Sequence, residues 1–354
     1  MSQKIMNNKL IWLGINILMV IVMVIIGGIT RLTDSGLSMT EWNLIGGIIP
    51  PMNEEKWLEA YDKYKLFPEY NLVNSNMHLI EFKKIFFWEY FHRIWGRIIG
   101  LTFFLPLVYF WIKGRFTNNE KKYLTLLSIL GIFQAFMGWY MVKSGLIDRP
   151  DVSHFRLSIH LLTAFLIYSM LLYSFWIIFS AKKKYQANFK ISRLKTHKKN
   201  LLRSLILLYI TITAGALVSG TDAGLSYNNF PLMEEHFLPP ILLSFDLFKP
   251  EILFYDQGFL QFSHRILATI TLLFVSHTIF KAKKDNFFRN HLFLFYALVA
   301  TLIFQYSLGI IILKLFVPIF LGLLHQIGAL IILSLLIISL CEANIKNNRG
   351  RISP

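Results

Sequence analysis

Long uncharged apolar runs constrain the fold of this chain more than any other feature of its sequence. Six of these runs could each cross the roughly 30 Å of hydrocarbon in a bilayer as an α-helix. They extend over Leu10 to Thr30, Tyr123 to Val142, Leu157 to Ala181, Ser204 to Thr221, Asn290 to Leu313 and Leu315 to Cys341. Two shorter runs, Ile98 to Ile112 and Ile266 to Phe280, reach that length only if each helix begins upstream and takes in His92 or His264. We therefore predict an all-α, polytopic membrane protein with eight transmembrane helices.

The first apolar run is expected to remain in the protein as a transmembrane helix. It is too long for the apolar region of a signal peptide, and it lacks a small-residue cleavage site before Arg31. The residues before it do not have the Arg-rich and Ser-rich composition of a transit peptide. These features favour a bacterial inner membrane as the location.

The net charge of +16, from 36 basic and 20 acidic residues, follows the membrane topology. The segment from Lys182 to Arg203 carries nine Lys or Arg and no acid, whereas Asp222 to Asp256 carries six acids and one lysine. By the positive-inside rule, both termini are cytoplasmic and the loops Arg31 to Lys84 and Asp222 to Gly258 lie outside. Because the charge is explained in this way, we expect no nucleic-acid partner.

The chain has one cysteine, Cys341, near the cytoplasmic end of the last predicted helix. A disulfide within the chain is therefore excluded. A thiolate zinc site and an iron–sulfur cluster are excluded for the same reason.

Five motifs occur twice in the same order, which indicates an internal repeat. The pairs are TDSGLS at 33–38 with TDAGLS at 221–226, a Pro pair in each outer loop, EYFHR with QFSHR, GIFQAFMG with LIFQYSLG, and SIHLLTA with LLHQIGA. Each half has four helices, so both halves enter the membrane from the same side and are parallel repeats. We predict two four-helix bundles, residues 1–181 and 204–354, joined by a basic cytoplasmic linker at 182–203.

Four of the ten histidines occupy matched positions in the repeat: His92 and His160 in the first half, and His264 and His325 in the second. We interpret His277 as a packing or interface residue and assign the remaining histidines, which fall in loops or at helix ends, to solvated surface. These are His78, His154, His197, His236 and His291. A lone buried histidine is usually structural, but two imidazoles facing the core of a four-helix bundle are suited to hold a haem iron between them. Zinc would require three or four ligands in each half, so we predict one haem per half.

Arginines near these histidines are candidate partners for the two haem propionates, because a guanidinium binds a carboxylate in a bidentate manner. Arg93 and Arg265 directly follow a histidine in each half, and Arg97 lies further along the same predicted helix. Arg156 lies four residues before His160. The alternative for Arg97, which we weigh equally, is a charged residue that snorkels to the lipid headgroups.

The two halves differ at one position that bears on chemistry. Glu89 lies three residues before His92, whereas Gln261 occupies the matching position before His264. A carboxylate beside a macrocycle can transfer a proton or stabilise a cation, and the isosteric amide cannot. The first haem site is therefore predicted to be reactive, with Glu89 as its catalytic residue, and the second to be a carrier. The competing interpretation is that Glu89 only forms an ion pair with Arg93.

The sequence closely resembles the haem A synthase family, in the subgroup shared by alphaproteobacteria and mitochondria. The resemblance rests on GGITRLTDSGLS, on FPEYNLVNSNMHLIEFKKIFFWEYFHRIWGR and on the four repeated histidines. It implies an enzyme that oxidises the C8 methyl group of haem O to a formyl group, producing haem A for cytochrome oxidase. It also implies that His92 and His160 bind the substrate haem, that Glu89 is the family's characteristic acid, and that His264 and His325 bind haem b. A second subgroup carries a cysteine pair in its outer loops, which this chain lacks.

Two other functions are compatible with parts of the pattern. A diheme membrane electron carrier that exchanges electrons with a quinol would leave both haems unchanged, and this is the main alternative. A secondary transporter is disfavoured, because inverted repeats and broken helices at the midplane are missing. The expected partners are haem O and membrane lipid, with an electron donor and the haem O-producing farnesyltransferase expected at family level. A homo-oligomer is also compatible with the sequence.

Overall fold

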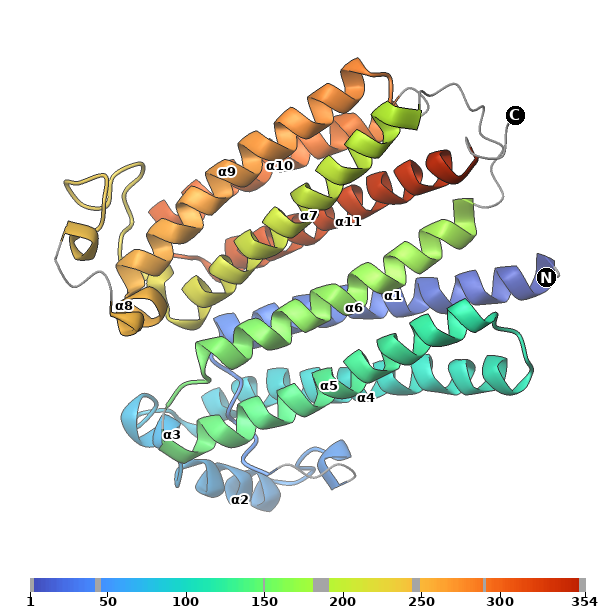
Figure 1. Ribbon diagram of the computed structural model, residues 1–354. Coiled ribbons are helices and arrows are strands. Elements are labelled where there is room, and N and C mark those ends of the chain that lie inside the picture. Colours follow the sequence, from blue (N-terminus) through green and yellow to red (C-terminus); the bar gives the residue numbers. More distant parts are fainter. Residues whose placement is uncertain are drawn as a thin grey trace. The chain divides into compact units, whose positions relative to one another are not determined.

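The computed structural model describes residues 3–41, 46–148, 150–180, 191–243, 249–288 and 291–349. Eight long helices dominate it (Figure 1). They are α1 (Gln3–Leu32), α4 (Leu79–Ile112), α5 (Asn118–Asp148), α6 (His154–Ser180), α7 (Ile191–Gly220), α9 (Gln257–Lys284), α10 (Leu292–Lys314) and α11 (Ile319–Arg349). Among the described residues, β pairing is confined to an isolated bridge between Met233 and His236. The predicted all-α class is confirmed.

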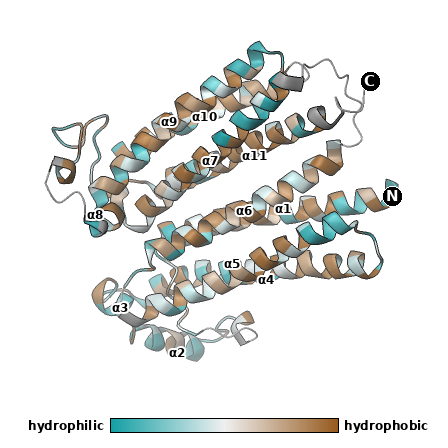
Figure 2. Cartoon of the chain, viewed as in Figure 1, coloured by the Kyte–Doolittle hydropathy of each residue, from teal (hydrophilic) through white to brown (hydrophobic). Residues whose placement is uncertain are grey.

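All eight long helices are long and apolar enough to cross a membrane. Figure 2 shows their ribbons coloured mainly as hydrophobic, with hydrophilic residues concentrated near the ends. The two predicted helices with short apolar runs do begin upstream, at Leu79 and Gln257, so that His92 and His264 lie inside α4 and α9. The prediction of eight membrane-spanning helices is therefore confirmed.

The chain divides into two compact units, residues 15–168 and residues 1–14 with 169–354. The division into halves at 1–181 and 204–354 remains a prediction. Helix α7 begins at Ile191, inside the predicted linker 182–203, and residues 181–190 lie outside the described part of the chain.

In the carboxyl-terminal unit, α7 packs on α9, α9 on α10, α10 on α11, and α11 returns to α7. Fully buried aliphatic side chains fill the contacts, among them Val275 and Ile279 of α9, Leu298 of α10 and Leu333 of α11. Apolar side chains are also compatible with lipid, so helices in a membrane rely on close packing and on hydrogen bonds between them. The 2.6 Å bond between the hydroxyls of Thr211 and Thr271 is one such contact between α7 and α9.

In the amino-terminal unit, α1 and α4 are joined by hydrogen bonds from side chains to main-chain carbonyls. Trp95 Nε1 donates to the carbonyl of Met19 at 2.9 Å, and Asn16 Nδ2 donates to that of Thr102 at 3.4 Å. Helix α4 also contacts α5. These contacts set α1 beside the segment of α4 that carries His92.

Two short helices, α2 (Glu54–Tyr64) and α3 (Pro68–Leu72), lie between α1 and α4 and were not predicted from the sequence. Asn53 caps α2, with its side-chain oxygen accepting from Lys56 N at 2.9 Å. An aromatic cluster joins these helices to α4: Tyr64 packs on Phe82 with ring centroids 5.1 Å apart, and Trp57 packs on Phe86 at 5.0 Å. The cluster also buries Met39, and so fixes the loop that follows α1.

Glu69 on α3 is a buried acid outside the membrane-spanning helices, with 5% of its surface exposed. Its Oε2 has no hydrogen-bond partner among the described residues. Burial, followed by the negative charge of Glu89, raises the pKa of Glu69 to about 8. The folded segment therefore keeps this proton over a range in which an unfolded chain would have lost it.

We predict that the α2–α3 segment becomes less stable as pH rises from about 4.5 to about 8. The unfolded segment releases the Glu69 proton near pH 4.5 and the folded segment only near pH 8, so rising pH favours opening. In Glu69→Gln this pH dependence should disappear, because the amide does not titrate.

Hydrogen exchange of amides 54–72 at pH 5 and pH 8, corrected for intrinsic rates, measures this effect. Glu55→Gln, at an exposed acid on α2, is the matched control and should behave as the wild type. Equal pH dependence in wild type and Glu69→Gln would contradict the assignment.

Candidate functional site

The four repeated histidines lie on four different long helices, α4, α6, α9 and α11, and each faces a glycine on another helix. An ideal Cβ on the glycine would lie only 2.9 to 3.2 Å from Cε1 of the imidazole. The pairs are Gly27 with His92, Gly138 with His160, Gly215 with His264, and Gly309 with His325. A side chain at any of these glycines would displace the ring. The glycines therefore allow each imidazole to lie against the backbone of the neighbouring helix.

In the carboxyl-terminal unit, His264 and His325 face each other. Their ring centroids are 6.5 Å apart and their planes are inclined by 78°. His264 Nδ1 donates to the main-chain carbonyl of Thr211 at 3.2 Å. This bond places the proton on Nδ1 and leaves the Nε2 lone pair of His264 available to a metal.

In the amino-terminal unit, His92 is oriented in a comparable way by α1. The Thr30 hydroxyl donates to the carbonyl of Ile26 at 2.9 Å, so at 3.4 Å it accepts from His92 Nδ1. Nε2 of His92 therefore carries the free lone pair. His160 differs, because its Nε2 lies 3.2 Å from the side-chain Nε2 of Gln134 on α5.

Glu89 is buried on α4, with 3% of its surface exposed, and it accepts hydrogen bonds from three donors. The Ser38 hydroxyl and the Met39 main-chain N–H both donate to Oε2 at 2.7 Å. Arg93 Nη2 forms a short ion pair with Oε1. The ion pair considered from the sequence is therefore present, and two further donors from the loop after α1 hold the same carboxylate.

Arg93 also ties α4 to the backbone of that loop, through bonds of 3.0 Å to the carbonyls of Met39 and Glu41. The guanidinium thus stabilises the loop and the Glu89 carboxylate together. Its role in this arrangement is electrostatic as well as structural, since the ion pair is almost fully buried.

The carboxyl-terminal unit has a similar arrangement, but the side chain at the position of the acid donates hydrogen bonds to the loop instead of accepting them. Gln261 Nε2 donates to the carbonyls of Ala223 at 2.9 Å and Tyr227 at 3.1 Å. Arg265 donates to Gln261 Oε1 at 3.1 Å and to the Tyr227 carbonyl at 2.8 Å. Tyr227 matches Met39 in the repeated motif, so the arginine contacts are equivalent in the two halves. The acid at position 89 is the difference.

The two remaining candidate arginines lie on the same helices as the first-half histidines. Arg97 on α4 approaches Gly47, whose ideal Cβ would lie 3.6 Å from Arg97 Nη2. Arg156 on α6 lies with its guanidinium carbon 4.5 Å from the ring centroid of Tyr140, a cation–π contact. Both side chains are partly exposed.

Sequence reasoning missed the residues that orient the candidates. Thr211 occupies a helix position that belongs to no quoted motif. Thr30 and Ser38 lie within GGITRLTDSGLS and Met39 directly follows it, so these three residues were detectable. The assignment to solvated surface was wrong for His154 and His197, which are buried. His197 lies in α7, where its Nε2 is 3.0 Å from Asp285 Oδ2.

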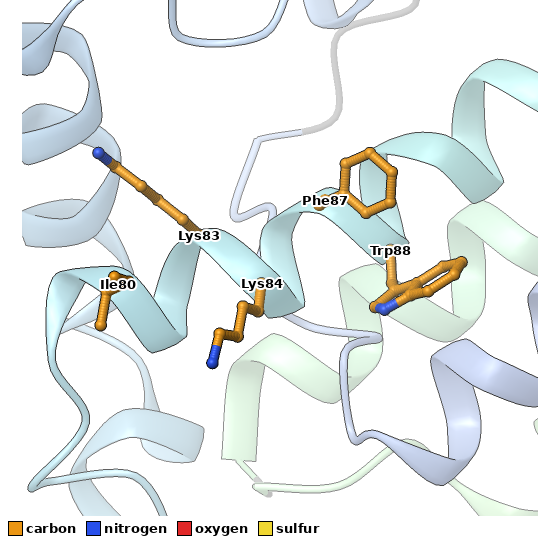
Figure 3. A pocket seen from close by; sticks show the side chains of 5 residues that line it. All are labelled: Ile80, Lys83, Lys84, Phe87 and Trp88. Atoms are coloured by element: carbon orange, nitrogen blue, oxygen red, sulfur yellow. The ribbon is translucent and has the colours of Figure 1, made fainter. Parts of the chain in front are cut away.

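Two shallow pockets lie at the amino-terminal end of α4. Figure 3 shows the smaller one, of about 340 Å³, lined by Ile80, Lys83, Lys84, Phe87 and Trp88. The larger, of about 560 Å³, is lined in part by Thr33, Ser35, Asn74, Glu81 and Trp88. Lysine and tryptophan at a helix end are typical of a membrane–water interface. None of the candidate site residues lines either pocket.

In the part of the chain that the structure describes, no group of three or more His, Cys, Asp or Glu could hold a metal ion. A haem iron requires only two of them, because the macrocycle supplies the other ligands.

Comparisons with known proteins identify the family. A family model described as cytochrome oxidase assembly protein matches residues 10–337. Heme A synthase of Rickettsia bellii (strain OSU 85-389) is 42% identical over 344 residues, covering 95% of this chain and 98% of that protein. Heme A synthase of Flavobacterium psychrophilum is 40% identical over 339 residues, covering 93% and 96%. Both comparisons extend across the two units, and they confirm that this chain belongs to the haem A synthase family of cytochrome oxidase assembly proteins.

Proposed function

We propose that this protein is a haem A synthase, which oxidises the C8 methyl group of haem O to a formyl group and so provides haem A for cytochrome oxidase. The observation that carries the proposal is the buried Glu89 carboxylate in a site whose repeat carries Gln261. The names of the relatives support the same activity.

The geometry of His264 and His325 supports a haem b site in the second half. Metal–imidazole distances of about 2 Å, plus roughly 1 Å from each nitrogen to its ring centre, separate two coordinated rings by about 6 Å. The observed 6.5 Å fits this value. Haem b bound there would supply electron transfer, and its iron ligands would be His264 and His325.

The first half is proposed to hold the substrate haem between His92 and His160. Both rings are partly exposed, and both lie against a glycine. Thr30 fixes the tautomer of His92 that leaves Nε2 available to iron. The first-half residues therefore bind and orient the macrocycle, with Glu89 one turn away on the same helix as His92.

Glu89 is proposed to act as the catalytic group. Its three donors favour the ionised carboxylate, which can stabilise positive charge that develops on the substrate. A carboxylate has about four lone-pair sites. Two donors occupy Oε2, whereas Oε1 accepts from Arg93, so Oε1 keeps a lone pair that can accept a proton. Gln261 provides neither negative charge nor a proton site.

The four arginines are proposed as partners of the haem propionates: Arg93, Arg97 and Arg156 in the first half, and Arg265 in the second. Arg93 and Arg265 already hold the outer loops, so a propionate would share their guanidinium groups with main-chain carbonyls. The guanidinium of Arg156 packs on the ring of Tyr140, so it would bind a propionate without sharing its donors with main-chain carbonyls.

The proposed location is the bacterial inner membrane, with both termini cytoplasmic. The basic segments and the eight spans support this orientation. An electron donor, the haem O-producing farnesyltransferase and a second copy of the chain are proposed as partners at family level.

Glu89→Gln should still bind haem but form haem A more slowly, by on the order of 10² to 10⁴ fold, the usual contribution of a general acid or base. Mass spectrometry of the extracted haem measures the ratio of formylated to unoxidised or hydroxylated macrocycle. Glu55→Gln, at an exposed acid on α2, is the control and should keep wild-type output. Wild-type haem A from Glu89→Gln would defeat the catalytic role. Haem that is never formylated in the wild type would favour the electron carrier.

His92→Ala and His264→Ala should each lower the haem content from about two per chain to about one, because each removes one of two protein ligands at one iron. His264→Ala should lose haem b, and His92→Ala should lose the farnesylated haem. Quantification of extracted haems by chromatography distinguishes the two. Loss of the same haem from both variants would contradict the assignment of one site per half.

A further inference from the structure

Two glutamines that match in the repeat make different hydrogen bonds. Gln134 on α5 and Gln305 on α10 each lie four residues before the glycine that faces a histidine, and so on the same helix face as that glycine. Gln134 Nε2 lies 3.2 Å from Nε2 of the His160 ring. Gln305 Nε2 instead donates to the main-chain carbonyl of His325 at 2.8 Å. The Gln134 amide is therefore hydrogen-bonded to the metal-binding nitrogen of its histidine, whereas the Gln305 amide is bound to the backbone.

A single residue on the facing helix accounts for the difference. Gly328, three residues after His325, leaves room for the Gln305 amide: an ideal Cβ there would lie 1.9 Å from Gln305 Oε1. Thr163 occupies the matching position after His160 and is buried, with its hydroxyl donating to the carbonyl of Ile159 at 2.8 Å. The threonine side chain fills the space that Gln305 uses in the other half, so the Gln134 amide reaches the ring.

This contact fixes the state of His160 when it is not bound to iron. An amide nitrogen only donates, so Nε2 of His160 accepts and the ring proton lies on Nδ1. His160 Nδ1 has no hydrogen-bond partner among the described residues. His92 has the opposite arrangement, because Thr30 binds its Nδ1 and leaves Nε2 uncovered. A ligand oriented through its other nitrogen is held more firmly.

We propose that Gln134 is a positioning residue that makes His160 the exchangeable ligand of the substrate haem, while His92 stays on the iron. The proposal rests on the function proposed above. In the exchange, the bond from iron to His160 Nε2 breaks and the hydrogen bond from the Gln134 amide to the same nitrogen forms. No electron or proton is transferred in this step.

The exchange gives the first half two properties that a substrate site needs and a resident cofactor site does not. It opens one coordination position, and it loosens the hold on the macrocycle so that the product can leave. In the second half, Thr211 fixes His264, and the Gln305 amide is bound to the backbone and so does not compete for Nε2 of His325. Nδ1 of His325, like Nδ1 of His160, has no hydrogen-bond partner among the described residues, so the position of the glutamine is what distinguishes the two halves.

Carbon monoxide binding to the reduced, haem-loaded, full-length protein tests the proposal, because the gas can bind only after an imidazole has left the iron. We expect carbon monoxide to bind in two kinetic phases, of which the faster comes from the first half. His160→Ala should accelerate this fast phase and so assign it to the first half. Gln134→Met, which keeps the side-chain volume and removes the amide, should slow it about fivefold to tenfold, the effect expected of one neutral hydrogen bond. Gln305→Met, the matched control, should change neither phase.

Thr163→Gly provides a second test that leaves Gln134 in place. It removes the Thr163 side chain, so Gln134 can bind the α6 backbone as Gln305 binds the backbone in the second half. The fast phase should then slow, as it does in Gln134→Met. Unchanged rates in both Gln134→Met and Thr163→Gly, or equal slowing by Gln305→Met, would overturn the proposal. Formyl analysis of the haem from the same samples tests the proposed function separately, since carbon monoxide reports ligand exchange whether or not the haem is oxidised.

Discussion

A buried carboxylate needs compensating donors, and this requirement at Glu89 organises the outer end of the amino-terminal unit. An ionised acid without partners would be costly in a low-dielectric interior. The loop after α1 turns back to present the Ser38 hydroxyl and the Met39 N–H, and Arg93 binds both the acid and the loop. The aromatic cluster of α2 and α4 packs on Met39 and keeps the loop in place. The charge, the loop and the outer helices are therefore one interdependent structure.

The internal repeat distinguishes features that are common to the two proposed haem sites from features that occur in one of them. Both halves have a glycine behind each imidazole and an arginine that binds the loop carbonyl at Met39 or Tyr227. The differences are the acid at position 89 and the residue that faces the glutamine, Thr163 or Gly328. In the proposed function, these small local differences distinguish the site for the substrate from the site for a resident cofactor.

The spans and the histidine positions could be predicted from sequence because they rest on hydropathy and on repetition. The helices α2 and α3 could not, since they are short and are stabilised by aromatic contacts with α4. The burial of His197 and of Glu69 depends on packing between distant segments, which composition does not reveal. The motif containing Gln134 was recognised, but its contact with His160 depends on Thr163 from another helix.

The most direct test of the account is an experimental structure of the protein with haem O bound. The account predicts the farnesylated macrocycle between His92 and His160, with its C8 methyl group on the side of Glu89, and a haem without the farnesyl group between His264 and His325. A farnesylated haem in the second pair, or a Glu89 carboxylate directed away from the macrocycle, would contradict it.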